Sequence, residues 1–309
     1  MYFPYLRARQ YELIALRELV SERSLGKIKP VLEPVRMGFN NLNLAHKVFE
    51  QFDFQAYLIV NPLQGEMAGN SDVFLDYISG VVSSRFLPAF HYADNYDYIK
   101  KSIDHFRLAN CMLICLDNFS DEQSFRKLCE NPAVDHIMLL EPNKYRNLDK
   151  FIKSLKKSYI RLDDLFERQQ KNADYLNILA HKFTEEHLFY IEDGYQGFSD
   201  FTVLPREFVD GGSTPRAVVI HLTYVNQESE NQIWIRHFTS DTNDSIVNVQ
   251  GKFAEAAGKA SVFCKSANLR NSAIDELLAY YDEHRYPGLG TVKKISIKNH
   301  LLVVSSYLK

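Results

Sequence analysis

The sequence lacks several features by which large classes of proteins are recognised. It contains no apolar run of about 18 residues, the length a membrane-spanning helix needs. Its opening residues, MYFPYLRARQYE, lack the apolar core of a secretion signal. It has only four cysteines, and none forms the CxxC pair typical of zinc and thioredoxin sites. We therefore expect a cytoplasmic protein with reduced thiols and no membrane partner.

An excess of charge of one sign is also missing. The formal net charge is -3, which provides no general attraction to nucleic acid. One local exception runs from Lys144 to Arg161, where seven lysines and arginines accompany a single aspartate. We interpret this segment as the solvated face of a helix. Salt-sensitive nucleic-acid binding is the alternative, ranked last because no binding motif accompanies it.

The glycine-rich and catalytic signatures of common enzymes are absent as well. The sequence contains neither GxGxxG nor GxxxxGK[ST], which argues against a dinucleotide fingerprint and a P-loop. It also contains neither GxSxG nor HExxH, so the usual hydrolase elbow and zinc-protease helix are not expected.

What the sequence does contain is a repeat of short apolar runs, each closed by a polar residue and followed by an amphipathic stretch. The runs begin at Ile28, Tyr57, Phe86, Met112, Ile137 and Tyr159, and successive starts lie 22 to 29 residues apart. Strands that alternate with helices at this spacing form a parallel sheet, and this many in series predict a (β/α)8 barrel of the TIM type.

The pattern changes in the second half of the chain. We expect residues 1–190 to form the barrel body, with a helix over 163–179 and a last buried strand over 187–193. Residues 191–309 are expected to add an antiparallel hairpin, two helices and the closure of the barrel. The hairpin strands span 216–225 and 231–240, and the helices span about 251–265 and 271–284. The whole chain is interpreted as one integrated domain.

The polar residues that close the runs are the candidate site, because barrel chemistry is located at the carboxyl ends of the strands. Asp117 and Glu141 are expected on adjacent strands, where they can act as an acid–base pair or hold a divalent cation such as magnesium. His91 is a candidate proton shuttle. The four candidate catalytic residues are Glu33, His91, Asp117 and Glu141.

Other residues are candidates for binding the ligand. Two arginines, Arg7 and Arg161, can clamp a phosphate or carboxylate. The remaining candidate ligand-binding residues are Asn61, Asp163 and Asp200. Together the set suits binding or hydrolysis of an anionic, phosphate-containing or nucleotide ligand. The alternative interpretation is structural, because Glu-Pro and Asn-Pro are ordinary turn sequences at strand ends.

Two histidines of the hairpin form a second, weaker candidate. His221 and His237 are expected to face one another across the strand pair. Zinc requires three or four ligands, and no further ligand can be assigned from the sequence. A structural hydrogen bond is the favoured interpretation.

The opening residues also resemble a known family. Pro4, Arg7, Arg9, Glu12, Ala15 and Leu16 follow the pattern P-x-x-[KR]-x-[KR]-x-x-E-x-x-A-L, and KPVLEP comes next. This pattern, with the later stretches GYQGFSDFT, IRHFTSD and GKFAEA, is similar to the Beta-protein family of bacterial and phage-associated proteins. The resemblance implies a TIM barrel of undefined activity, which occurs near antiviral defence loci beside nuclease-like partner proteins.

Two functions therefore remain open. The first is a barrel enzyme, a hydrolase or transferase, acting on a phosphorylated or nucleotide-like ligand. The second is a non-catalytic sensor or scaffold in a phage-defence system. That function would use an exposed apolar patch of the hairpin around Trp234 to contact a partner protein.

Overall fold

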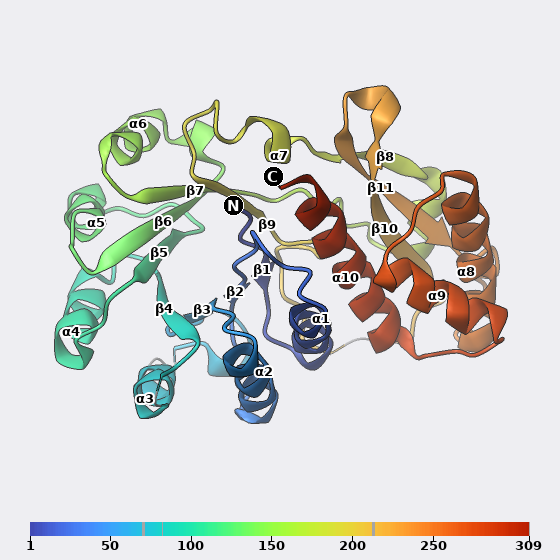
Figure 1. The fold of residues 1–309 in the computed structure, drawn as a ribbon, viewed down its shortest axis with the longest axis horizontal. Coiled ribbons are helices and arrows are strands. Elements are labelled where there is room, and N and C mark those ends of the chain that lie inside the picture. The colour runs from blue at the N-terminus through green and yellow to red at the C-terminus, as the bar shows by residue number, and fades with distance from the viewer. Residues whose placement is uncertain (70–71, 82, 212–213, 309) are drawn as a thin grey trace.

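The computed structural model describes residues 1–69, 72–81, 83–211 and 214–308, and its centre is a parallel sheet that closes into a barrel (Figure 1). Each strand is hydrogen-bonded to the next in the order β1-β2-β3-β4-β5-β6-β7-β9. A parallel bridge between Tyr2 and Phe198 joins the last strand to the first. The strands are β1 (Tyr5–Leu6), β2 (Val31–Leu32), β3 (Ala56–Ile59), β4 (Phe86–His91), β5 (Cys111–Cys115), β6 (Val134–Leu140), β7 (Ser158–Asp163) and β9 (Gly197–Asp200).

Helices follow the strands and cover the outside of the barrel, which confirms the predicted (β/α)8 fold. They are α1 (Gln10–Ser21), α2 (Asn40–Gln51), α3 (Asp72–Gly80), α4 (Tyr96–Phe106), α5 (Glu122–Cys129), α6 (Arg146–Ser154), α7 (Glu186–Phe189) and α10 (Leu289–Tyr307). Short 3-10 turns connect some of the elements: η1 (Gly65–Met67), η2 (Pro142–Lys144), η3 (Asn172–Asn177) and η4 (Gln227–Ser229).

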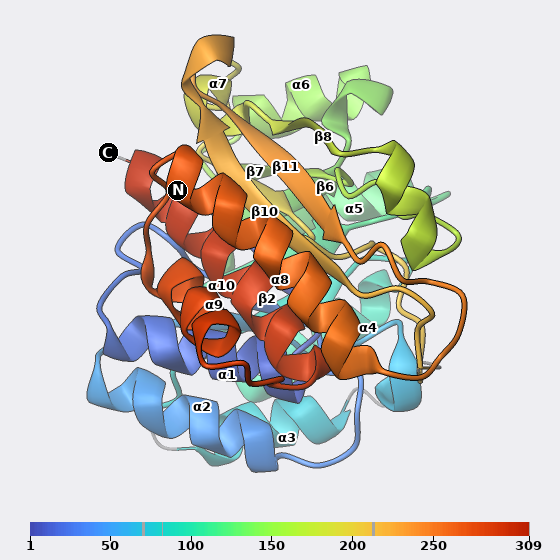
Figure 2. The same ribbon diagram turned by 90° about the vertical axis from the view of Figure 1, so that its right-hand side faces the viewer.

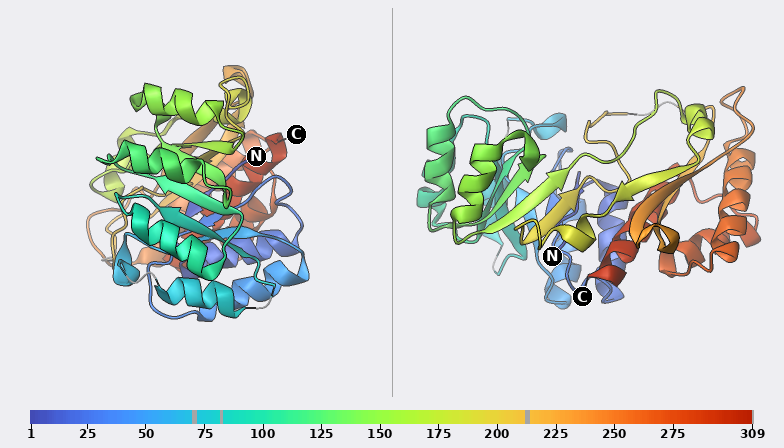
Figure 3. Two further views of the ribbon diagram at one scale, coloured as in Figure 1. Left: turned by 90° about the vertical axis from the view of Figure 1, so that its left-hand side faces the viewer. Right: turned by 90° about the horizontal axis from the view of Figure 1, so that it is seen from above.

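A second, antiparallel sheet lies beside the barrel, on the side opposite α4 and α5 (Figures 1 and 3). Its order is β10-β11-β8, with β8 (Ala180–Thr184), β10 (Val219–Asn226) and β11 (Gln232–Thr239). The hairpin of β10 and β11 is the predicted one. Helices α8 (Val249–Ser266) and α9 (Ser272–Asp282) pack with α10 against this sheet (Figure 2).

Two segments differ from the sequence-based prediction. Residues 187–193, predicted to be a barrel strand, contain the end of the one-turn helix α7, and Ile191 is 68% exposed. The eighth barrel strand is β9 instead. Residues 163–179, predicted to be a helix, contain only the 3-10 turn η3. The segment just after them forms β8, which pairs with β11 of the hairpin. This long-range pairing stabilises a strand that is short and polar.

Three apolar clusters fill the molecule. One fills the barrel interior and includes Tyr57, Met112 and Ile160. The second lies between the barrel strands and their helices, and the third lies between the sheet strands β10 and β11 and the helices α8 to α10. Helix α10 contributes Ile297 and Leu301 to the second cluster and Val292 and Ile295 to the third. The barrel and the inserted sheet are therefore packed on one shared helix.

Candidate functional site

Side-chain alternation along the strands decides which strand-end residues meet inside the barrel mouth. Successive residues of a strand point to opposite faces of the sheet. Tyr5, Ile59 and Ile114 belong to the interior cluster. The residues two positions after Tyr5, Val31, Ile59 and Ala89 therefore also face inward. These residues are Arg7, Glu33, Asn61 and His91.

Glu33 is the centre of this inward-facing group and is fully buried. One carboxylate oxygen accepts a hydrogen bond from the Tyr5 hydroxyl at 2.9 Å and forms an ion pair with Arg7. The other oxygen accepts the backbone NH of Leu63 at 3.0 Å. His91 Nε2 lies 2.9 Å from the Tyr5 hydroxyl and 3.7 Å from Glu33. Since the hydroxyl proton goes to Glu33, Nε2 of His91 is the donor to Tyr5.

These contacts keep Glu33 ionised. Burial by itself raises the pKa of this carboxyl group, but the neighbouring His91 and Arg7 and the backbone NH of Leu63 lower it to about 2. Burial, together with the charge of Glu33, raises the pKa of Tyr5 well above its ordinary value, so Tyr5 keeps its proton. Nδ1 of His91 is buried and has no hydrogen-bond partner among the described residues. Asn61 is bonded to the backbone NH and carbonyl of His91, both at 2.8 Å, and so holds that strand end.

The segment after β9 crosses the mouth and covers this group. Phe201 packs against the Tyr5 ring, with 5.0 Å between centroids, and Arg7 donates to the backbone carbonyl of Arg206. Arg206 itself donates to the carbonyl of Leu116 at 3.1 Å. This segment therefore covers the mouth and leaves an opening beside Arg7 and Phe201.

That opening is a cavity of about 170 Å³ with a cationic lining. Four of its side chains are basic: Arg7, Arg9, Arg168 and Lys293. Among the described residues, Glu207 is its only acidic lining residue, and it pairs with Arg168 at 3.0 Å. Lys293 is held at 2.6 Å by the buried carboxylate of Glu12. Arg9 has no ion-pair partner among the described residues, and its guanidinium lies 5.7 Å from the centre of the Phe208 ring.

Asp117 and Glu141 lie outside this group. Each follows an inward-facing leucine, Leu116 or Leu140, and therefore points away from the barrel interior. The Asp117 side chain is 70% exposed and pairs with Arg206. Glu141 has a left-handed backbone conformation, with φ at 47°, and pairs with Lys144. The two carboxylates thus have separate cationic partners and do not form the expected acid–base pair.

Arg161, Asp163 and Asp200 lie on the outer face of the barrel wall. Arg161 bonds to Asp163 at 2.6 Å and approaches Glu186 of α7 at 3.5 Å. Burial, opposed by Arg161, raises the pKa of Asp163, and burial raises that of Glu186 to about 7. Asp200 accepts the Tyr2 hydroxyl at 2.6 Å, beneath α10. None of the three lines the cavity at the mouth.

The hairpin histidines face one another as predicted, with their Nδ1 atoms 2.7 Å apart. His181 of β8 lies beside this pair, and its ring centre is 5.3 Å from that of His237. Trp234 is half-buried and donates to Gln232, so it does not form the expected exposed patch. No group of three or more histidine, cysteine, aspartate or glutamate side chains in the described ranges can hold a metal ion.

Several residues of the cavity were not identified from the sequence. Tyr5, Arg168 and Lys293 come from the first strand, the loop after β7 and the start of α10. Only the fold brings them together, because they are up to 288 positions apart in the chain. Arg9 carried a signal in the sequence, since it follows Tyr5 and Arg7 at a spacing of two residues.

Comparison with family models, with curated proteins and with solved structures gave no match for this chain. Within the residues that the structure describes, none of the helices is both long and apolar enough to cross a membrane.

Proposed function

We propose that the protein binds a small phosphate-containing anion in the cationic cavity at the barrel mouth. The observation that carries the proposal is the lining: four basic side chains surround a cavity whose single acidic residue is already paired. Arginine guanidinium groups bind phosphate through parallel hydrogen bonds, and a lysine adds a point charge. Glu33 and Glu12 fix the directions of Arg7 and Lys293, so their positions are set before a ligand arrives.

The proposal is for binding. Asp117 and Glu141, the residues expected to move protons, are engaged by Arg206 and Lys144. Of the candidate catalytic residues, Glu33 and His91 lie directly beneath the cavity, linked through Tyr5. Their contacts explain how Arg7 is oriented, and this orientation is the role that we assign to them.

The test is isothermal titration calorimetry of the full chain with inorganic phosphate at low salt. It compares the dissociation constant of wild type with that of Arg9→Met. Arg9 is the suitable position because it has no carboxylate partner within the described part of the chain, so its removal leaves no buried carboxylate unpaired. A hydrogen bond to a charged group contributes about 1.5–3 kcal/mol. We therefore expect phosphate to bind wild type about 10- to 150-fold more tightly than Arg9→Met.

The matched control is Arg270→Met, which removes an exposed arginine between α8 and α9. This variant should bind phosphate as wild type does. Absence of phosphate binding by wild type, or equal binding by wild type and Arg9→Met, would exclude the proposal.

A further inference from the structure

A second cavity, of about 380 Å³, lies next to the first, between the barrel mouth and the inserted sheet. Both cavities are lined by Arg168, Leu204, Pro205 and Lys293, so they adjoin one another, and we refer to the pair as the two chambers of one cleft. The size of the second chamber lies within the range of about 300–1,000 Å³ that is usual for small-molecule sites.

The lining of the second chamber differs in chemistry from that of the first. Aromatic rings come from Phe166, Tyr175 and His221, and His221 lies 5.1 and 4.9 Å from the other two ring centres. Burial and the neighbouring His237 hold the pKa of His221 well below its usual value, so its ring is neutral. No lining residue of this chamber in the described ranges is acidic.

Amide side chains form the rest of the polar lining. Asn172 donates to the carbonyl of Ala217 at 2.9 Å, which fixes its orientation. The side-chain amides of Gln169 and Gln170 have no hydrogen-bond partner among the described residues. An amide that is both donor and acceptor can pair with the edge of a nucleobase, and aromatic rings can stack on its face.

We propose that the ligand is a nucleotide whose phosphate occupies the cationic chamber and whose base occupies the aromatic and amide-lined chamber. This inference rests on the proposed function, since it takes phosphate binding as its first half. The cleft accounts for both parts of such a ligand: Arg7 and Arg9 face the anionic end, and Phe166 with the glutamine amides faces the base. Arg168 and Lys293 border both chambers, where the ribose and phosphate would meet.

The experiment titrates the full chain with the 5′-monophosphates of adenosine, guanosine, cytidine and uridine, with adenosine alone and with inorganic phosphate. The variant is Phe166→Leu, which keeps an apolar side chain and removes the ring. Stacking of one base on an aromatic side chain contributes about 1–3 kcal/mol. We expect at least one nucleotide to bind more tightly than phosphate, and Phe166→Leu to weaken that binding by about 5- to 150-fold.

The control is Phe189→Leu, at a 42% exposed phenylalanine of α7, which should bind the nucleotide normally. Phosphate binding should be equal in both phenylalanine variants and wild type, and Arg9→Met should weaken phosphate and nucleotide by the same factor. If phosphate binds through Arg9 but no nucleotide binds more tightly, or if Phe166→Leu has no effect, the nucleotide inference is wrong while the proposed function stands. If phosphate itself does not bind, both are wrong.

Discussion

Single side chains in the barrel interior have environments that their sequence context does not reveal. Glu33 is followed by proline, a combination that also occurs in ordinary turns. In the structure it is fully buried and accepts hydrogen bonds from Tyr5, Leu63 and Arg7. Because a buried carboxylate without partners is unfavourable, these donors are what permit an acidic residue in the mouth. Glu33 is thus a positioning residue for Arg7.

At the opposite, amino-terminal end of the barrel, His136 provides a test of stability against pH. It lies in the interior, where Nδ1 is 2.8 Å from the Tyr57 hydroxyl. Burial and the charge of Lys29 lower the pKa of His136 to about 4, against a smaller opposing effect of Asp135. The unfolded chain has the ordinary pKa of about 6.5 and binds more protons below it. The free energy of unfolding should therefore fall as the pH falls from about 6.5 towards 4.

Urea unfolding at about pH 7.5 and about pH 5.5 measures this effect. We expect His136 to contribute on the order of 1 kcal/mol to the loss of stability between the two. His136→Gln should reduce the loss by that amount, whereas His105→Gln, at an exposed histidine of α4, should leave it unchanged. An equal loss in wild type and His136→Gln would contradict the assigned cause.

Whole elements differ in how much of their structure the sequence reveals. Strands β3 to β7 were predicted because their interior and exterior faces are both buried, which produces continuous apolar runs such as CMLIC. Strand β9 was missed because its sequence, GFSD, is short and polar. The structure explains these small residues: a Cβ on Gly197 would lie 2.6 Å from the Phe3 ring, and Ser199 donates to the carbonyl of Phe3. The contact with Phe3, just before β1, therefore explains why β9 has small residues at these two positions.

The candidate site was only partly predicted, and the reason is similar to that for β9. The sequence places a polar residue at each strand end, but it does not show where each strand stops pairing. The direction of a side chain reverses with each residue, so the strand-end residues of the first four strands meet inside, while Asp117 and Glu141 do not. The cleft also needs Arg168, Phe166 and Lys293, which come from irregular segments and from α10. No local periodicity identifies such residues.

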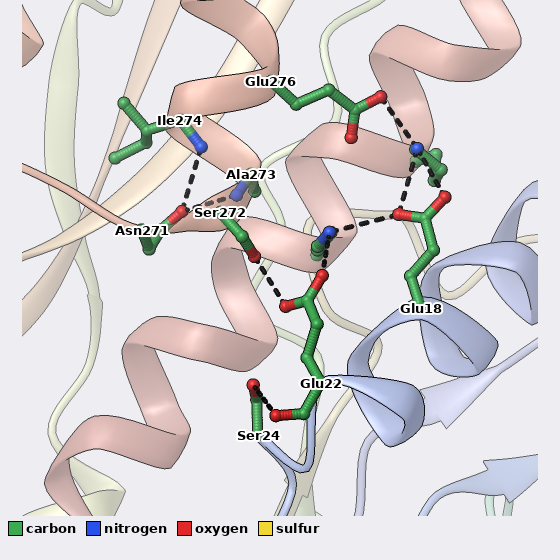
Figure 4. Close-up of polar contacts among 10 residues, drawn as sticks. Glu18, Glu22, Ser24, Asn271, Ser272, Ala273, Ile274 and Glu276 are labelled. Carbon is green, nitrogen blue, oxygen red and sulfur yellow. Dashed lines mark hydrogen bonds and ion pairs between the residues drawn. The ribbon is translucent and has the colours of Figure 1, made fainter.

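At the level of elements, α1 is joined to α9 and α10 by an ion-pair cluster (Figure 4). Lys294 is bonded to Glu18 of α1 and Glu276 of α9, both at 2.8 Å, and Lys298 to Glu22, the residue that follows α1, at 2.7 Å. Both lysines are buried. Burial lowers the pKa of Lys294, but the two glutamates outweigh it and raise the pKa above its usual value.

Replacement of Lys294 by methionine tests this cluster. The variant keeps roughly the length of the side chain, removes the cation that Glu276 contacts and leaves Glu18 with Lys298 alone, at 3.1 Å. Removing one partner of a fully buried pair costs about 3–5 kcal/mol. Since 34% of the Glu18 side chain is exposed, we expect a smaller loss, of about 1–3 kcal/mol, in the free energy of unfolding measured in urea. Lys150→Met, at an exposed position of α6, should change it by less than about 0.5 kcal/mol.

At the level of the molecule, the barrel and the inserted sheet are joined where the barrel closes. The Tyr2 hydroxyl donates to Asp200 at 2.6 Å and lies 2.9 Å from Nε2 of His300 on α10. The other ring nitrogen of His300 lies 3.2 Å from the Thr223 hydroxyl on β10. The chain of contacts thus runs from the first barrel residues through α10 to the inserted sheet. Burial and Asp200 raise the pKa of Tyr2 well above its ordinary value, so the hydroxyl remains a donor.

This arrangement predicts that the barrel and the inserted sheet unfold together. Chains of this size often unfold through intermediates, so a single transition is a specific expectation. Trp234 is the only tryptophan and lies on β11, so its fluorescence reports on the inserted sheet. Far-ultraviolet circular dichroism reports on the helices, most of which surround the barrel. In urea, the two signals should change with the same midpoint.

Tyr2→Phe tests whether the closure contacts couple the two parts. The variant removes one of the donors to Asp200, whose Oδ2 already has no hydrogen-bond partner among the described residues. Leaving a buried polar group unsatisfied costs about 1–3 kcal/mol. We expect this loss to appear equally in both signals, and Tyr11→Phe, at a tyrosine whose hydroxyl makes no hydrogen bond within the described chain, to leave both midpoints unchanged. If Tyr2→Phe lowers the dichroism midpoint while the Trp234 transition stays in place, the inserted sheet is an independent unit, because its stability then does not depend on closure of the barrel.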